Sequence, residues 1–65
     1  MTIGEKIREL RKKKHMTQQE LAEKTNITCA TIINIEKDYN KPSASSLYKI
    51  CEVLECNYDK LSELL

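Results

Sequence analysis

The sequence predicts an all-α fold of five short helices. Apolar residues recur along the chain at the spacing of one helix face, and a Ser, Thr or Asn precedes each such segment, as helix N-caps do. No segment shows the alternation of polar and apolar residues that is typical of a strand. With only 65 residues, the chain is expected to form one domain, residues 1–65, around a small core.

Capping boxes are expected to begin the first two helices, because in each case a Thr is followed by a Glu three residues later. Thr2 begins the first helix, which should stop near His15. Thr17 begins the second helix, which is shorter and should end by Asn26, since Asn adopts the left-handed backbone conformation more readily than most residues. The side chains expected to point inward from these two helices are Ile3, Ile7, Leu10, Leu21 and Ala22.

A third helix is expected from a Thr28 cap to about Lys37. At about 100° per residue, its side chains fall into two groups on opposite faces. The face expected to pack against the rest of the chain carries Thr28, Thr31, Ile32 and Ile35. The face expected to look outward carries Cys29, Ala30, Ile33, Asn34 and Lys37.

Residues 38–42 are predicted to form a loop, because they include turn formers and a proline that a helix cannot run through. Ser43 is expected to cap a fourth helix and Asn57 a fifth one. Tyr48 and Tyr58 are interpreted as packing residues. The other side chains expected to point inward are Leu47, Ile50, Cys51, Leu54, Leu61 and Leu64.

The net charge of +1 conceals an uneven distribution. Residues 1–41 hold nine basic and six acidic side chains, whereas residues 42–65 hold two basic and four acidic ones. The basic excess is densest at residues 11–14. A cationic run at the end of a helix suits the helix dipole, and it also suits contact with nucleic-acid phosphates. Both interpretations stay open on this feature alone.

The composition argues against an enzyme, a metal centre or a cofactor site. Three cysteines without a C-x-x-C pair and a single histidine do not supply a zinc ligand set. No catalytic set and no glycine-rich phosphate loop is present. The odd cysteine count is typical of a reducing cytoplasm. No apolar run reaches membrane-spanning length and the amino end lacks a secretory signal, so we expect a cytoplasmic protein with no membrane partner and no small-molecule substrate.

The second and third segments have the form of a helix-turn-helix, in which two short helices meet at a short turn and a small residue, here Ala22, lets them approach. Beyond this form, the residues resemble a family, the lambdoid phage repressors and Cro (Xre-type). The resemblance covers nearly the whole chain. It rests on residues 3–11, 17–24, 26–28, 31–32, 35–37, 40–43, 47–50 and 61–65.

This resemblance implies a five-helix, lambda-repressor-like domain that binds double-stranded DNA as a dimer on a near-palindromic operator, with its third helix in the major groove. Such a protein is a small transcriptional regulator, a repressor, and not an enzyme. The residues implied to contact base edges are Thr28, Cys29, Ala30, Ile33 and Asn34. The residues implied to contact phosphates are Gln18, Lys37, Tyr39, Asn40 and Lys41. Arg11 and Glu36 are implied to form a structural ion pair.

The outward face of the third helix departs from the family pattern, because its base-facing positions hold Cys29, Ala30 and Ile33, with Asn34 as the one strong polar side chain among them. One interpretation is an A·T-rich half-site, read through thymine methyl groups and an Asn34 contact to adenine. The alternative is a protein-interaction module, antitoxin-like, that keeps the fold and reads DNA weakly or not at all. Self-association is expected to be weak or to require DNA, with Leu64 and Leu65 as candidate contacts.

The turn positions where this family usually has glycine are occupied here by other residues, because the chain has a single glycine. They hold His15, Asn26, Asp38 and Glu55. His, Asn and Asp are enriched in the left-handed conformation that such turns require, whereas Glu is not. Glu55 is therefore the exception among the four expected turns.

Overall fold

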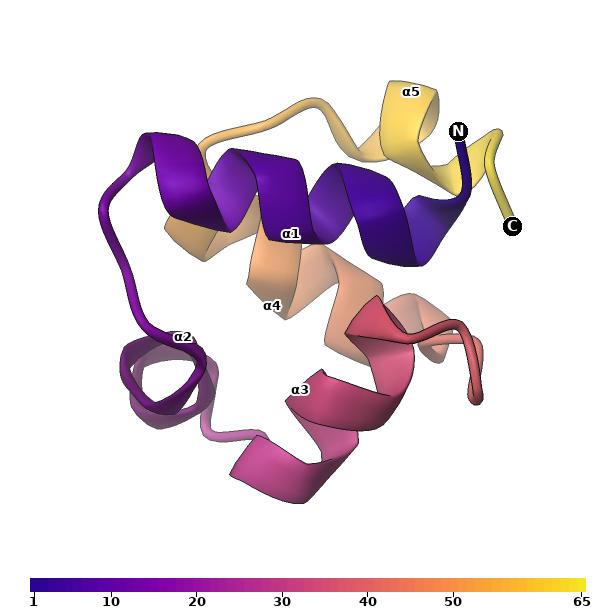
Figure 1. Ribbon diagram of the computed structural model, residues 1–65. Coiled ribbons are helices and arrows are strands. Elements are labelled where there is room, and N and C mark those ends of the chain that lie inside the picture. Colours follow the sequence, from indigo (N-terminus) through magenta and orange to yellow (C-terminus); the bar gives the residue numbers. More distant parts are fainter.

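The computed structural model describes residues 1–65 and contains five α-helices and no strand, so the predicted all-α fold is confirmed (Figure 1). The helix bounds are α1 Ile3–Lys13, α2 Gln18–Thr25, α3 Cys29–Glu36, α4 Ala44–Leu54 and α5 Tyr58–Ser62. In Figure 1, α1 crosses in front of α4, with α5 above it and α2 and α3 below it. This arrangement agrees with the packing of α1 against α3, α4 and α5.

Each helix begins at the N-cap that the sequence predicts. The side-chain oxygen of the cap accepts a hydrogen bond from the backbone N–H three residues later, at 3.0 to 3.3 Å in the five helices. Thr2 and Thr17 also form complete capping boxes, because the glutamate three residues on accepts the N–H of the cap. Caps of this kind satisfy amides that would otherwise lack a partner at the start of a helix.

Four turns share one backbone design. The residues with positive φ are His15, Asn26, Asp38 and Glu55, with φ between 56° and 62°. In each turn, the N–H of the next residue donates to a carbonyl five positions earlier, and these N···O distances are 2.9 to 3.2 Å. This bond is the mark of the Schellman helix end. The predicted left-handed positions are therefore confirmed, including Glu55, although glutamate is not a residue that favours them.

The core lies where α1, α2, α3 and α4 meet, and α5 closes it. Its six largest fully buried side chains are Ile7, Leu21, Ile32, Ile35, Leu47 and Ile50. Burial of an aliphatic side chain of this size stabilises a fold by about 1.5 to 3 kcal/mol. The core therefore fixes how α2 and α3 sit on the other helices.

Gly4 allows the start of α1 to approach the end of α3. A Cβ atom at this position would lie 2.4 Å from the carbonyl oxygen of Ile35 and 2.7 Å from that of Glu36, which is closer than real contacts allow. Asp38 joins the same two elements, since its carboxylate accepts the Gly4 N–H at 3.0 Å and the Thr2 hydroxyl at 2.5 Å. A carboxylate at a helix N-terminus is favourable.

Three side chains predicted to pack are exposed. Thr28 is exposed because its hydroxyl caps α3 at the surface. Leu64 is 38% exposed, since α5 already ends at Ser62 and Leu64 lies beyond the last turn. Tyr48 is 56% exposed, although its ring lies 6.2 Å from that of Tyr58, centroid to centroid. The predictions of inward packing are wrong for Thr28 and Leu64, and only one side of Tyr48 packs.

Candidate functional site

A tight turn between α2 and α3 sets the direction of α3. Asn26 adopts the left-handed conformation with φ 58°, and the Ile27 N–H donates to the carbonyl of Ala22 at 3.1 Å. Ala22 is 4% exposed, and its small side chain lets the two helices pack closely. The predicted helix-turn-helix is therefore present, and α3 lies at the edge of the molecule in Figure 1.

Helix α3 presents one packed face and one outward face. Ile32, Ile35 and Glu36 are buried. On the opposite side of the helix, Ala30 and Lys37 are exposed and Asn34 is half-buried. The backbone carbonyl of Asn34 accepts the N–H groups of Tyr39 and Asn40, at 2.9 and 3.4 Å, so the end of the helix that carries this side chain is held firmly.

Two of the residues implied to contact bases lie between these faces. Ile33 is half-buried on one flank of α3. Cys29 packs against the core and lines a shallow hollow with Ala22 and Ile27. The expectation that Cys29 lies on the outward face is thus met only in part, because the first turn of α3 packs against α2. Thr28, by contrast, is exposed at the N-cap of α3.

Arg11, Glu36 and Gln18 form one polar network, in which Arg11 and Glu36 are buried and Gln18 is half-buried. The Arg11 Nε and Nη2 atoms donate to the two carboxylate oxygens of Glu36 at 2.7 and 3.0 Å. Nη1 of Arg11 donates to the carbonyl of Met16 at 2.8 Å, and the Gln18 side-chain amide donates to Glu36 Oε1 at 3.2 Å. The structure brings the expected pair together. The link to Gln18 is an addition, because sequence pattern alone gives no sign of it.

A polar hollow lies where this network reaches the surface. Arg8, Arg11, Gln18, Glu36 and Lys37 line it. The Glu36 carboxylate is already paired with Arg11, which leaves two exposed cations, Arg8 and Lys37, beside the N-terminus of α2. A helix N-terminus attracts anions through its free N–H groups and its dipole. Sequence reasoning missed Arg8, and the one signal for it was its position one turn before Arg11.

The segment after α3 is exposed and cationic. Lys37, Tyr39, Asn40 and Lys41 are all exposed. The Lys37 ammonium lies 5.9 Å from the centre of the Tyr39 ring, a cation–π distance. The backbone N–H groups of Tyr39 and Asn40 donate to the carbonyl of Asn34, so this loop is joined directly to the outward part of α3.

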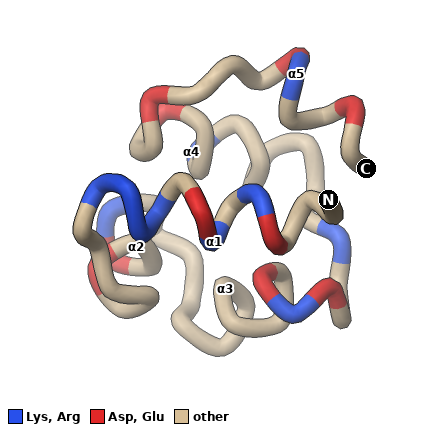
Figure 2. The backbone as a smooth tube through the Cα atoms, turned by 45° about the horizontal axis from the view of Figure 1, so that its top comes forward, with Lys and Arg blue, Asp and Glu red and all other residues tan.

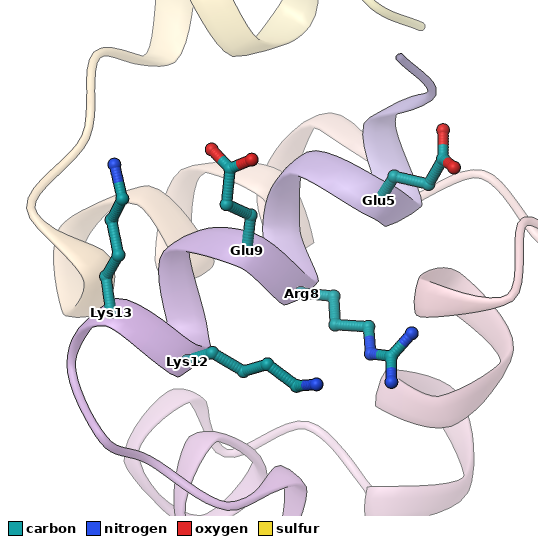
Figure 3. A pocket seen from close by; sticks show the side chains of 5 residues that line it. All are labelled: Glu5, Arg8, Glu9, Lys12 and Lys13. Carbon is teal, nitrogen blue, oxygen red and sulfur yellow. The ribbon is translucent and has the colours of Figure 1, made fainter.

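The outer surface of α1 carries five charged side chains around an open hollow, namely Glu5, Arg8, Glu9, Lys12 and Lys13. A single helix lines it, so it encloses no ligand. Figure 3 shows that Arg8 and Lys12 extend to the side of α1 on which α2 and α3 are drawn, whereas Glu9 and Lys13 extend the other way. Lys6 donates to Glu9 at 3.0 Å and lowers the pKa of that carboxyl.

The charges of the whole chain are unevenly placed. Figure 2 shows a run of Lys and Arg at the end of α1, close to α2, whereas basic and acidic residues alternate along the end of α3 and the segment that follows it. No group of three or more His, Cys, Asp and Glu side chains is arranged to hold a metal ion, and the three cysteines are free thiols. None of the helices has the length and apolar character that crossing a membrane requires.

Proteins with similar sequences include a phage repressor and a bacterial transcriptional regulator. A helix-turn-helix family model matches residues 7–61. The immunity repressor protein of Bacillus phage phi105 is 39% identical over 83% of this chain and 38% of its own length. The transcriptional regulator ImmR of Bacillus subtilis is 36% identical over 94% of this chain and 48% of its own length. The chain thus spans less than half the length of these two relatives.

Solved structures share the fold closely. The biofilm master regulator SinR, in complex with DNA, superposes with a TM-score of 0.88 at 32% identity, over 94% of this chain and 98% of that one. The P22 c2 repressor, in complex with a synthetic operator, gives a TM-score of 0.89 at 28% identity, over 94% and 92% of the two chains. The predicted lambda-repressor-like fold is confirmed by these similarities.

Proposed function

Because the chain belongs to the helix-turn-helix family, we propose that residues 1–65 form the DNA-binding domain of a cytoplasmic transcriptional repressor, which is not an enzyme. The observation that carries this proposal is the outward face of α3, beside which lie the polar hollow at Gln18 and the exposed cationic segment after the helix, with Lys37 belonging to both. An α-helix fits the major groove of B-DNA, and cations beside it suit contact with the phosphate backbone.

In this proposal, the centre of the outward face reads the bases. The Asn34 amide pairs with adenine N6 and N7, and Ala30 and Ile33 contact thymine methyl groups. Thr28 and Cys29 reach bases nearer the N-terminus of α3, with Cys29 restricted by its packing on α2. Apolar contacts and one amide favour A·T pairs, so the proposed half-site is A·T-rich.

In this proposal, phosphates are contacted by two neighbouring sets of residues near the C-terminal end of α3. Gln18 offers its backbone N–H at the start of α2, and its side-chain amide keeps one hydrogen free beyond the bond to Glu36. Arg8 lies in the same hollow as Gln18, and we add it to the phosphate contacts. The other proposed contacts come from the exposed segment after the helix, namely Lys37, Tyr39, Asn40 and Lys41, of which Lys37 also lines the hollow.

Two copies bind a near-palindromic operator in this proposal, with weak self-association that DNA reinforces. The structures of SinR with DNA and of the P22 c2 repressor with a synthetic operator support the DNA partner. The immunity repressor protein of Bacillus phage phi105 supports repression as the regulatory outcome. No observation favours the alternative of a protein-interaction module.

A gel-shift titration with random-sequence DNA over a range of salt concentrations tests the proposal. We expect binding at low salt and a linear fall of the logarithm of the binding constant with the logarithm of the salt concentration. Each phosphate contact should add about 0.9 to the exponent, which is the magnitude of this slope. Lys41→Ala should lower that exponent by about one. Lys60→Ala, which removes an exposed lysine on α5, is the matched control and should leave it unchanged. Absence of retained DNA at the lowest salt would contradict the proposal.

A further inference from the structure

Cys51 and Cys56 lie at the two ends of the turn that closes α4. Cys51 is 4% exposed in the core, and Cys56 is half-buried against it. Glu55, between them, has the left-handed conformation with φ 56°. This conformation turns the chain back, so that the Cys56 N–H donates to the Cys51 carbonyl at 3.0 Å.

This hydrogen bond limits the separation of the two α-carbons. A Cα atom lies about 2.4 Å from its own carbonyl oxygen and about 1.5 Å from its own nitrogen. With the N···O distance of 3.0 Å, the two Cα atoms lie within about 7 Å of each other, which is the range a disulfide spans. Helix ends of this kind also bring these two side chains into contact. Burial and the neighbouring Cys56 thiol raise the pKa of Cys51 to about 12.

We propose that Cys51 and Cys56 form a reversible intrachain disulfide across the end of α4, by exchange with disulfides of low molecular weight. Cys56 is the entry point, because it lines a small open groove between α1 and α5 with Leu10 and Leu61. Cys51 is the closing partner, because the core covers it. The bond fixes the Glu55 turn at the end of α4.

The exchange balances in two steps. The Cys56 thiolate attacks one sulfur of the small disulfide, which forms a mixed disulfide and releases one thiolate. The Cys51 sulfur then attacks the Cys56 sulfur, its proton passes to the solvent, and the second small thiol leaves. Two protein thiols are oxidised and one small disulfide is reduced to two thiols. The raised pKa of Cys51 slows the second step, because the thiolate is the attacking form.

Cys29 is not a partner in this chemistry. It lies in α3 and lines a different hollow, together with Ala22 and Ile27. It therefore serves as an internal reporter, because it stays available to an alkylating reagent after the other two thiols have joined.

The test equilibrates the folded chain with mixtures of reduced and oxidised glutathione, blocks free thiols, and cleaves after glutamate without reduction. Cleavage at Glu52 and Glu55 separates the two cysteines, so their peptides stay together only if a disulfide joins them. We expect this linked pair in the monomer, with Cys29 blocked. The ratio of disulfide to dithiol should be at least about tenfold higher for the folded chain than in denaturant, since the folded turn already holds the two residues together.

Variants sharpen the result. Cys29→Ser is the matched control and should keep the linked pair, whereas Cys51→Ser and Cys56→Ser should each abolish it. The wild-type peptide map decides the question even where a serine variant fails to fold. The proposal is overturned if Cys29 enters the linkage, if oxidation yields only mixed disulfides or linked dimers, or if folding lowers the disulfide ratio.

Discussion

Arg11 of α1 donates two parallel hydrogen bonds to the carboxylate of Glu36 of α3, at 2.7 and 3.0 Å. The two side chains are only 9% and 2% exposed. The same guanidinium holds the carbonyl of Met16, and the same carboxylate accepts the Gln18 amide. One ion pair therefore links the end of α3 to the turn before α2. If Gln18 contacts a phosphate, this pair sets its position relative to α3.

Arg11→Met should lower the free energy of unfolding by about 3 to 5 kcal/mol, because it leaves the Glu36 carboxylate buried without its cation. Denaturant unfolding followed by circular dichroism measures this loss. The double variant Arg11→Met, Glu36→Leu should recover most of the stability, since apolar pairs often replace buried ion pairs without loss. Recovered stability together with weakened DNA binding would identify a positioning role. A loss below about 1 kcal/mol in the single variant would contradict the buried-pair account.

Gly4→Ala should destabilise the fold by about 1 to 3 kcal/mol, although alanine is the better helix former. The new methyl group would meet the carbonyl oxygens of Ile35 and Glu36, so α1 must move away from α3. Thermal unfolding measures the effect. Lys13→Ala, at an exposed position of the same helix, is the control and should change stability little. Equal stability of Gly4→Ala and the wild type would show that the two helices separate without cost.

Glu55→Gly should raise the melting temperature by about 5 °C, because glycine adopts the left-handed conformation without strain. The ion pair with Lys14 is lost, but Glu55 is exposed, and such pairs contribute little. Asn26→Gly is the matched substitution, and its gain should be smaller because asparagine tolerates the same conformation better. Equal gains at both sites would mean that residue type makes no difference to these turns.

Local features of the fold could be predicted from the sequence. The five N-caps depend on residues that are close together in the chain, and all of them are present. The four left-handed turns are also present, but their positions follow from the family resemblance, and the residue type supports them at His15, Asn26 and Asp38 and not at Glu55. The Arg11–Glu36 pair is predicted only by the family resemblance. The two residues are 25 positions apart, so no local pattern connects them. Periodicity alone carries no information on which residues of separate helices meet.

What the sequence missed depends on how the helices cross. The crowding at Gly4 exists only because α1 meets the end of α3. Cys29 leans on α2 because that junction is tight, and Leu64 is exposed because α5 is short. The hollow that contains Arg8 and Gln18 combines side chains from three helices. Each of these features follows from the packing of one helix against another. The spacing of apolar residues within one helix does not predict this packing.

Asn34→Ala should lower the preference for the selected operator over random DNA by about 1 to 3 kcal/mol and leave nonspecific binding nearly unchanged, because a base contact is lost and phosphate contacts remain. Gln18→Ala should instead weaken binding to both kinds of DNA. Gln19→Ala, at the exposed neighbouring position, is its control. Competition gel shifts measure all three variants. An equal loss on every sequence for Asn34→Ala would show that Asn34 reads no base.

Selection of binding sites from a random pool of double-stranded DNA tests the central claim most directly, that α3 reads the major groove of an operator. The account predicts two A·T-rich half-sites in inverted orientation, with centres one helical turn, or a multiple of it, apart. The Asn34→Ala variant should lose the preference for adenine at one position of each half-site. Recovery of no common sequence, or of one that Asn34→Ala leaves unaltered, would contradict the claim.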